Sequence, residues 1–203
     1  MSAMEKIAVQ RVVPVIRCAD PEDAVLTARA AAAAGMRVVE MTLTTPRVHD
    51  ALRELRGDGL VIGLGSLLRD ADVAPAVEAG AGFVVTFGAV PGFVAAAREA
   101  GVPAAQGALT PGEVLSADQA GADAVKIFPA RVVSPAYLRD LAAVLPDVRL
   151  VPTGGIGPGD VGPWLDAGAW AVGLGASLGT VAGVGTNEVE RRCRGALAAA
   201  ATG

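Results

Sequence analysis

The residue with the clearest chemical potential in this sequence is a lysine inside an apolar run. Lys126 lies in ADAVKIFPA, residues 122–130, with Val125 and Ile127 on either side. The chain has 17 basic residues, of which only Lys6 and Lys126 are lysines and the rest are arginines. A buried ammonium is costly, and lysine, unlike arginine, can lose its proton and act as a nucleophile. The sequence therefore favours amine chemistry at Lys126, with membership of a buried ion pair as the alternative.

A carboxylate and two glycine-rich stretches are the other candidates for chemistry. Glu40 lies in a second apolar run, and TGGIGPGD (153–160) and GLGASLG (173–179) each lead toward a helical segment. Backbone N–H groups at helix N-termini bind phosphate well. A lysine and a carboxylate at one site can act as nucleophile and acid–base group. The alternatives are a structural salt bridge and glycines that only turn the chain.

The elements that would hold these residues alternate regularly along the chain. Apolar runs predict strands at 12–16, 37–41, 60–64, 83–87, 103–106, 124–128, 149–152 and 170–174. Runs this continuously apolar are typical of parallel strands buried on both faces. Eight strands that alternate with helices predict an α/β fold, a single (β/α)8 TIM barrel over residues 1–203, with an extra N-terminal helix at about 3–10. A doubly wound sheet is the alternative.

Helix boundaries are marked by glycine and proline. Glycines expected in the left-handed conformation follow five predicted helices, at Gly35, Gly80, Gly101, Gly121 and Gly168. Four helix starts are predicted where a capping side chain precedes proline, at Asp20-Pro21, Thr45-Pro46, Thr110-Pro111 and Ser134-Pro135.

The barrel topology predicts that the candidate residues meet. Active sites of such barrels lie at the carboxyl ends of the strands, and inward side chains of alternate strands share a layer. Glu40 on the second strand and Lys126 on the sixth should therefore approach each other from opposite walls. Arg17 follows the first strand, and the two glycine-rich loops follow the seventh and eighth, where barrels often bind phosphate.

Composition excludes several classes of function. The chain has a net charge of −4 without a basic stripe, which argues against nucleic acid as a partner. Mean hydropathy is +0.48, but no apolar run is long enough to span a bilayer, and the N-terminus lacks the apolar core of a signal peptide. Cys18 and Cys193 form no metal or redox motif. We expect a reduced cytoplasmic protein without a metal.

The motifs together resemble a known enzyme family. PVIR (14–17), VVEMTLTTP (38–46), GLGS (63–66), VKIFPA (125–130) and VPTGGI (151–156) occur in the order found in 2-keto-3-deoxy-6-phosphogluconate aldolases. The related 4-hydroxy-2-oxoglutarate and 2-keto-3-deoxy-6-phosphogalactonate aldolases are similar as well. The resemblance spans nearly the whole chain, and VKIFPA and VEMTL are its most specific parts.

The resemblance implies a homotrimeric class I aldolase that uses no cofactor. Lys126 would form a Schiff base with the keto carbon, and Glu40 would move protons through a water molecule. The substrate would be a small keto acid or sugar phosphate, cleaved to pyruvate and an aldehyde. Substrate contacts are expected at Arg17, Thr44, Ser66, Phe87 and Thr153, and phosphate contacts at Gly154, Gly155, Gly175, Ala176 and Ser177.

Four of these positions depart from the pattern of the gluconate enzymes. Thr44 stands in place of an arginine, Ser66 of a threonine, Phe87 of a proline and Ala176 of a serine. Arg17 matches an arginine of the galactonate-type enzymes and is expected to compensate for Thr44. These changes leave open a second hypothesis, a barrel protein that binds a sugar phosphate without forming an imine. A non-catalytic protein that only oligomerises is a third.

Overall fold

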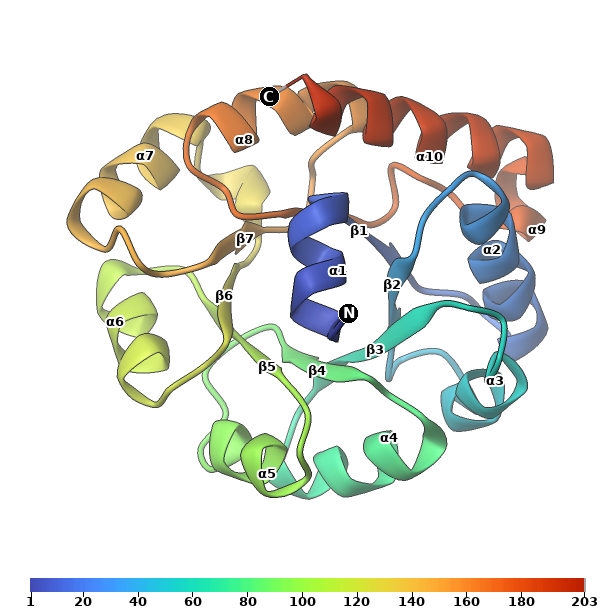
Figure 1. The fold of residues 1–203 in the computed structure, drawn as a ribbon, viewed down its shortest axis with the longest axis horizontal. Coiled ribbons are helices and arrows are strands. Elements are labelled where there is room, and N and C mark those ends of the chain that lie inside the picture. Colours follow the sequence, from blue (N-terminus) through green and yellow to red (C-terminus); the bar gives the residue numbers. More distant parts are fainter. Residues whose placement is uncertain (203) are drawn as a thin grey trace.

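The computed structural model, which describes residues 1–202, is a parallel β-barrel surrounded by helices (Figure 1). Its strands are β1 (Val12–Ile16), β2 (Val38–Thr42), β3 (Val61–Leu67), β4 (Phe83–Thr86), β5 (Ala104–Ala108), β6 (Ala124–Ile127), β7 (Leu150–Pro152) and β8 (Val172–Leu174). They are ordered β7-β6-β5-β4-β3-β2-β1-β8. A parallel bridge between Thr153 and Gly173 joins β7 to β8 and closes the ring. The (β/α)8 prediction is confirmed, and the doubly wound alternative is wrong because such a sheet would keep open edges.

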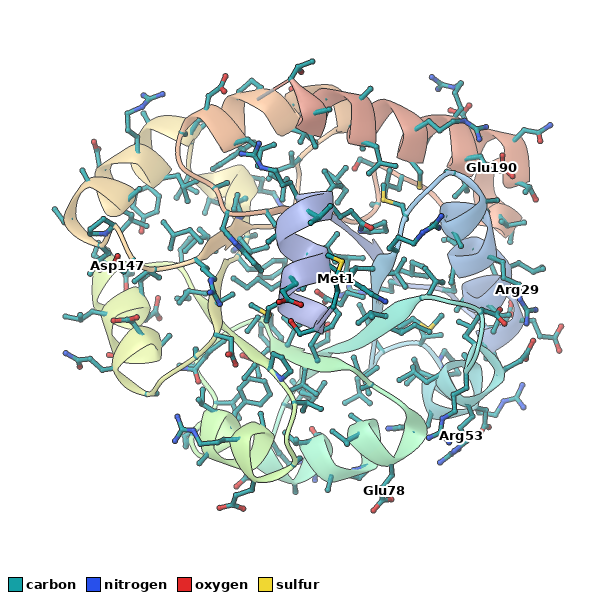
Figure 2. The ribbon with its side chains drawn as sticks, in the orientation of Figure 1. Met1, Arg29, Arg53, Glu78, Asp147 and Glu190 are labelled. Carbon is teal, nitrogen blue, oxygen red and sulfur yellow. The ribbon has the colours of Figure 1, made fainter. Side chains whose placement is uncertain are left out.

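Helices connect successive strands or follow the last one, and they form the outer ring, except for the N-terminal helix, which precedes the first strand. They are α1 (Ala3–Gln10), α2 (Pro21–Ala33), α3 (Val48–Glu54), α4 (Val73–Ala79), α5 (Phe93–Glu99), α6 (Pro111–Gln119), α7 (Pro135–Val144), α8 (Val161–Asp166), α9 (Val181–Val184) and α10 (Thr186–Ala201). Three 3₁₀ turns, η1 (Asp70–Asp72), η2 (Ala130–Val132) and η3 (Pro158–Asp160), lie in the loops. Charged side chains such as Arg29, Arg53 and Glu190 point outward at the rim (Figure 2). Within the described residues, no helix is both long and apolar enough to cross a membrane.

The N-terminal helix α1 lies across one end of the barrel (Figure 1). Ile7 belongs to a compact cluster inside the ring with Val13, Val38, Phe83, Val85 and Ala171, and Met4 packs against this cluster. The extra helix predicted at about 3–10 is therefore confirmed. It closes the amino-terminal end of the strands and leaves the carboxyl ends open.

Alternation along the strands separates two cores. Val39 and Met41 on β2, and Val125 and Ile127 on β6, pack in the larger core between the barrel and its helices. Because successive side chains of a strand point to opposite faces, residues 40 and 126 must point into the barrel. The periodicity of the strands thus forces two charged residues into the interior.

Most of the predicted helix boundaries are confirmed. Asp20, Thr110 and Ser134 accept hydrogen bonds from backbone N–H groups in the first turns of α2, α6 and α7. The five helix-ending glycines all have positive φ angles, between 73° and 112°.

The helix start predicted at Thr45-Pro46 is wrong. Helix α3 begins at Val48 and is preceded by Arg47 in the left-handed conformation. The Thr45 hydroxyl instead accepts a hydrogen bond from the backbone N–H of Cys18 at 3.2 Å. Thr45 is buried, so it ties the loop after β2 to the loop after β1 and does not cap a helix.

Candidate active site

The centre of the barrel holds a direct contact between Lys126 and Glu40. The Lys126 Nζ atom donates hydrogen bonds to both carboxylate oxygens of Glu40, at 2.8 Å and 3.2 Å. Each residue is only 4 % exposed. A buried charge pair of this kind is not in itself evidence of stabilisation, since desolvation offsets much of the attraction. The pair places a proton acceptor within hydrogen-bond distance of the only lysine inside the barrel.

Glycines on neighbouring strands make room for the inward side chains. A Cβ atom at Gly63 would lie 2.2 Å from the Phe83 ring, and one at Gly173 would lie 2.2 Å from the Thr153 hydroxyl oxygen. Neither distance is compatible with a side chain, so these glycines are needed for packing. Phe83 on β4 and Thr153, directly after β7, therefore project into space that their neighbours leave empty. Motif spacing gave no indication of this role.

A cavity of about 700 Å³ opens at the carboxyl ends of the strands above the lysine. Its lining includes the sequence-predicted residues Arg17, Thr44, Ser66, Phe87, Lys126, Thr153, Gly154, Gly155, Gly175, Ala176 and Ser177. Glu40 lies beneath this lining and reaches the site through its hydrogen bonds to Lys126. The structure thus brings the predicted substrate and phosphate residues to one cavity around the catalytic candidates.

Hydroxyl groups line the part of the cavity formed by β2 and β3. The Thr42 and Thr44 hydroxyl oxygens lie 3.0 Å apart in a hydrogen bond. Among residues 1–202, Ser66 is one of three non-glycine residues with positive φ, at 64°, and it lies where the register of β3 with β4 shifts. Residues held in this region of backbone space are strained and concentrate at functional sites. The strain at Ser66 is a feature that the sequence did not reveal.

The two glycine-rich loops are fastened to each other and to the helix that follows. The Ser177 hydroxyl donates a hydrogen bond of 2.7 Å to the carbonyl of Ile156, so it links the loop after β8 to the loop after β7. Arg192 on α10 donates to the Ser177 carbonyl at 3.1 Å. Gly154 and Gly155 have φ angles of 97° and 86°, which side chains other than glycine rarely adopt. The loops form one fixed wall of the cavity.

An apolar lip faces this wall. Phe87 is 45 % exposed and packs edge-on against Phe128, with ring centroids 6.3 Å apart. Leu68, which follows β3, is 60 % exposed and lines the same cavity. Sequence reasoning included Phe87 and missed Leu68 and Phe128. Phe128 is the last residue of the strand predicted at 124–128, and Leu68 lies a few residues beyond the one predicted at 60–64. These positions near strand ends were the available signal.

The two cysteines are free and buried. Burial, together with the neighbouring Asp23, raises the pKa of the Cys18 thiol to about 12. Cys18 does not line the cavity. Within residues 1–202, no cluster of three or more histidine, cysteine, aspartate or glutamate side chains could hold a metal ion.

Fold and site together define a (β/α)8-barrel protein with a lysine–carboxylate pair at the floor of an open cavity. Residues 3–194 match the family model described as KDPG and KHG aldolase. The chain belongs to this aldolase family, whose members are carbon–carbon lyases. The resemblance inferred from the motifs is therefore confirmed.

Named relatives give the same result. The chain is 32 % identical to a 2-dehydro-3-deoxy-6-phosphogalactonate aldolase of Escherichia coli (strain K12) over 170 residues, 82 % of this chain and 83 % of the relative. It is 35 % identical to a 2-dehydro-3-deoxy-phosphogluconate aldolase of Pseudomonas aeruginosa over 158 residues, 76 % of this chain and 72 % of the relative. A KDPG aldolase of Legionella pneumophila, solved with pyruvate captured as a covalent carbinolamine, superposes with a TM-score of 0.87 at 26 % identity, covering 96 % of this chain and 97 % of that one.

Proposed function

We propose that the chain is a class I aldolase that cleaves a 2-keto-3-deoxy sugar acid, its 6-phosphate, or 4-hydroxy-2-oxoglutarate to pyruvate and an aldehyde. The observation that carries the proposal is the 2.8 Å contact between the Lys126 amine and the Glu40 carboxylate inside the barrel. An amine that attacks a carbonyl must give up a proton, and Glu40 is placed to accept it. The carbinolamine captured in the Legionella relative supports the same order of events.

The proposed reaction begins when the Lys126 Nζ attacks the C2 carbonyl of the keto acid. Glu40 returns the proton that it took from the amine to the carbinolamine hydroxyl, which leaves as water, and the product is a protonated imine. Glu40 then takes the proton of the C4 hydroxyl and the C3–C4 bond breaks. The electron pair of that bond forms the C2=C3 double bond of an enamine, while the π electrons of the imine move to nitrogen. The C4 fragment leaves as the aldehyde. Protonation of C3 by Glu40 and hydrolysis of the imine release pyruvate and restore the free amine.

The cavity lining supports assigned positions for the substrate. The hydroxyls of Thr44, Ser66 and Thr153 surround the cavity above Lys126, where the C1 carboxylate next to the imine carbon would lie. The glycine-rich loops at 154–155 and 175–177 offer backbone N–H groups for a remote phosphate. Arg17 stands between these two groups, at the end of β1.

Borohydride reduction in the presence of pyruvate tests the imine. Because the chain has only two lysines, peptide mapping assigns the adduct without ambiguity. We expect a stable adduct on Lys126 and none on Lys6. Lys126→Arg should abolish it, and Lys6→Arg on α1 is the matched control that should retain it. A protein stabilised by sugar phosphates but not labelled by pyruvate would instead be a binding protein without aldolase chemistry, and the proposal would be wrong.

We further propose a homotrimer in the cytoplasm, as the family resemblance implies. The exposed apolar side chains of Leu68 and Val132, at 60 % and 61 % exposure, offer surface for contact between subunits. The two free, buried cysteines are consistent with a reducing compartment. Sedimentation equilibrium should give three times the chain mass of 20.2 kDa, and a monomer in solution would contradict the trimer.

A further inference from the structure

Arg131 is a cavity residue that neither the motifs nor the reaction so far explains. It follows β6, in the turn η2, and its backbone N–H donates to the Gly154 carbonyl at 2.9 Å. The preceding Ala130 N–H donates to the Thr153 carbonyl at 2.8 Å. A Cβ atom at Gly155 would lie 2.5 Å from the Arg131 Cβ. The backbone of Arg131 is therefore fixed against the glycine-rich loop, and its side chain lines the cavity.

The residues that follow β6, β7, β8 and β1 form an arc along one side of the cavity, and Arg131 lies at one end of it. Arg131 follows β6, Gly154 and Gly155 follow β7, residues 175–177 follow β8, and Arg17 follows β1. These strands are consecutive neighbours, because β7 and β8 are joined at the closure. The glycine-rich loops thus lie between two arginines. Thr44, Ser66 and Phe87 come from β2, β3 and β4 on the remaining part of the ring.

The charge of this arc is not neutralised by the protein. Several other arginines pair with carboxylates or carbonyls, as Arg29 does with Glu54 and Asp58. Across the described residues, the side chains of Arg17 and Arg131 make no ion pair or hydrogen bond, and no aspartate or glutamate lines the cavity. Unpaired guanidinium groups in a cavity whose lining carries positive charge attract anions. The planar guanidinium also matches the geometry of a phosphate group.

We propose that Arg131 is a specificity-determining residue that selects substrates with a phosphate at the end remote from the keto group. The proposal rests on the aldolase function argued above. In that reaction C2 is bonded to Lys126, so the C1 carboxylate stays next to the imine. The arc of Arg131 and the glycine-rich loops would then receive the other end of the substrate, beyond C4. 4-Hydroxy-2-oxoglutarate ends one carbon beyond C4, so the 6-phosphorylated six-carbon acids are the preferred substrate class.

The condensation direction tests this selection. Pyruvate is combined with glyceraldehyde 3-phosphate or with glyceraldehyde, and the ratio of the two kcat/KM values is the readout. Arg131→Ala should lower this ratio about tenfold to hundredfold, which is the expected loss of a charge-assisted hydrogen bond. Arg139→Ala on α7 is the matched control, because Arg139 is an exposed arginine outside the cavity. It should leave the ratio unchanged.

Two further measurements distinguish a failure of the Arg131 proposal from a failure of the proposed aldolase function. Inorganic phosphate should inhibit the wild-type protein, and its inhibition constant should rise in Arg131→Ala, with partial recovery in Arg131→Lys. If pyruvate labels Lys126 but Arg131→Ala lowers both kcat/KM values equally, or neither, the role of Arg131 is refuted while the aldolase function stands. If pyruvate does not label Lys126 at all, the proposed function itself fails.

Discussion

Gly65 on β3 leaves the space that the Glu40 carboxylate occupies. A Cβ atom at Gly65 would lie 2.0 Å from Glu40 Oε1 and 2.5 Å from its Cδ. The two residues are on neighbouring strands, with Thr42 of β2 directly opposite Gly65. The carboxylate can therefore rest under Lys126 only because position 65 carries no side chain. This contact connects the GLGS motif to the geometry of the catalytic candidates.

Gly65→Ala should displace the Glu40 carboxylate and break its alignment with Lys126. We expect kcat to fall at least tenfold, because displacements on the order of 1 Å in such a site can cost up to about a hundredfold in rate. Pyruvate condensation kinetics measure the effect. Gly195→Ala in α10 is the matched control, since a Cβ atom there meets nothing within 4 Å. Equal rates in the two variants would contradict the positioning role of Gly65.

Glu40→Gln should separate proton transfer from imine formation. The amide keeps the size of the side chain and an oxygen acceptor for Lys126, but it cannot shuttle protons. We expect exchange of the pyruvate methyl protons with deuterium to slow by about a hundredfold or more, the usual contribution of general acid–base catalysis. Borohydride should still trap pyruvate on Lys126, although more slowly, because the amide no longer accepts the amine proton. Methyl exchange at the wild-type rate would show that another group carries the proton.

Much of this architecture could be predicted from the sequence, because it depends on local patterns. Apolar runs and helix-ending glycines gave all eight strands to within a few residues, and strand alternation placed Glu40 and Lys126 inside the barrel. The same signals gave wrong element boundaries where contacts between residues distant in sequence determine the local structure. Strand β3 continues to Leu67, beyond the predicted end at 64, and Thr45 bonds the loop after β1 in place of a helix N-terminus.

The site was predictable in its motifs but not in the contacts between them. Arg131 directly follows VKIFPA, yet only the packing of η2 against Gly154 shows that it lines the cavity. The role of Ser177 also changes, since its hydroxyl bonds the Ile156 carbonyl and links two loops. Contacts of this kind join residues from different strands, and no spacing along one stretch of sequence records them.

Substitutions of Ser66 should separate its backbone strain from its hydroxyl. A left-handed backbone costs a non-glycine residue about 1–2 kcal/mol, which Ser66→Gly relieves and Ser66→Ala retains. Glycine also gains freedom in the unfolded chain, which offsets part of this gain. We therefore expect the free energy of unfolding in urea to be about 1 kcal/mol higher for the glycine variant than for the alanine variant. Both variants lack the hydroxyl and should lose about tenfold in kcat/KM. A glycine variant with the kcat/KM of the wild type would show that the Ser66 hydroxyl does not contact the substrate.

Neither cysteine should react with alkylating reagents in the folded protein. Burial raises the pKa of Cys18 to about 12 and that of Cys193 to about 11. At pH 8 the thiolate is then about one part in ten thousand for Cys18 and one in a thousand for Cys193. Iodoacetamide should label both only after unfolding in guanidinium, as mass spectrometry would show. Because folding favours the protonated thiols, their contribution to stability should fall as the pH rises above 9. Rapid native labelling of Cys18 at pH 8 would contradict its packing.

Asp23 holds the segment after β8 by hydrogen bonds that should weaken when its carboxylate is protonated at low pH. Its carboxylate accepts a hydrogen bond from the Ala182 N–H at 2.8 Å, and its neighbour Thr27 accepts one from the Val181 N–H at 2.9 Å. Burial alone would raise the pKa of Asp23, but the hydrogen bonds from Ala182 and Thr180 outweigh it and hold the pKa below the ordinary value of 3.8. The charged form is therefore the one that the fold stabilises.

Asp23→Asn should lower the free energy of unfolding by about 1.5–3 kcal/mol at pH 7, the worth of a hydrogen bond to a charged group. A carboxylate whose folded pKa is depressed contributes fully above its unfolded pKa and loses that contribution as the pH falls through the folded value. The difference between wild type and variant should thus stay constant from pH 7 to pH 5 and shrink below about pH 4. Urea unfolding across this range measures it, with the exposed Asp118→Asn on α6 as control. A difference that does not change with pH would mean that Asp23 acts through its shape and not its charge.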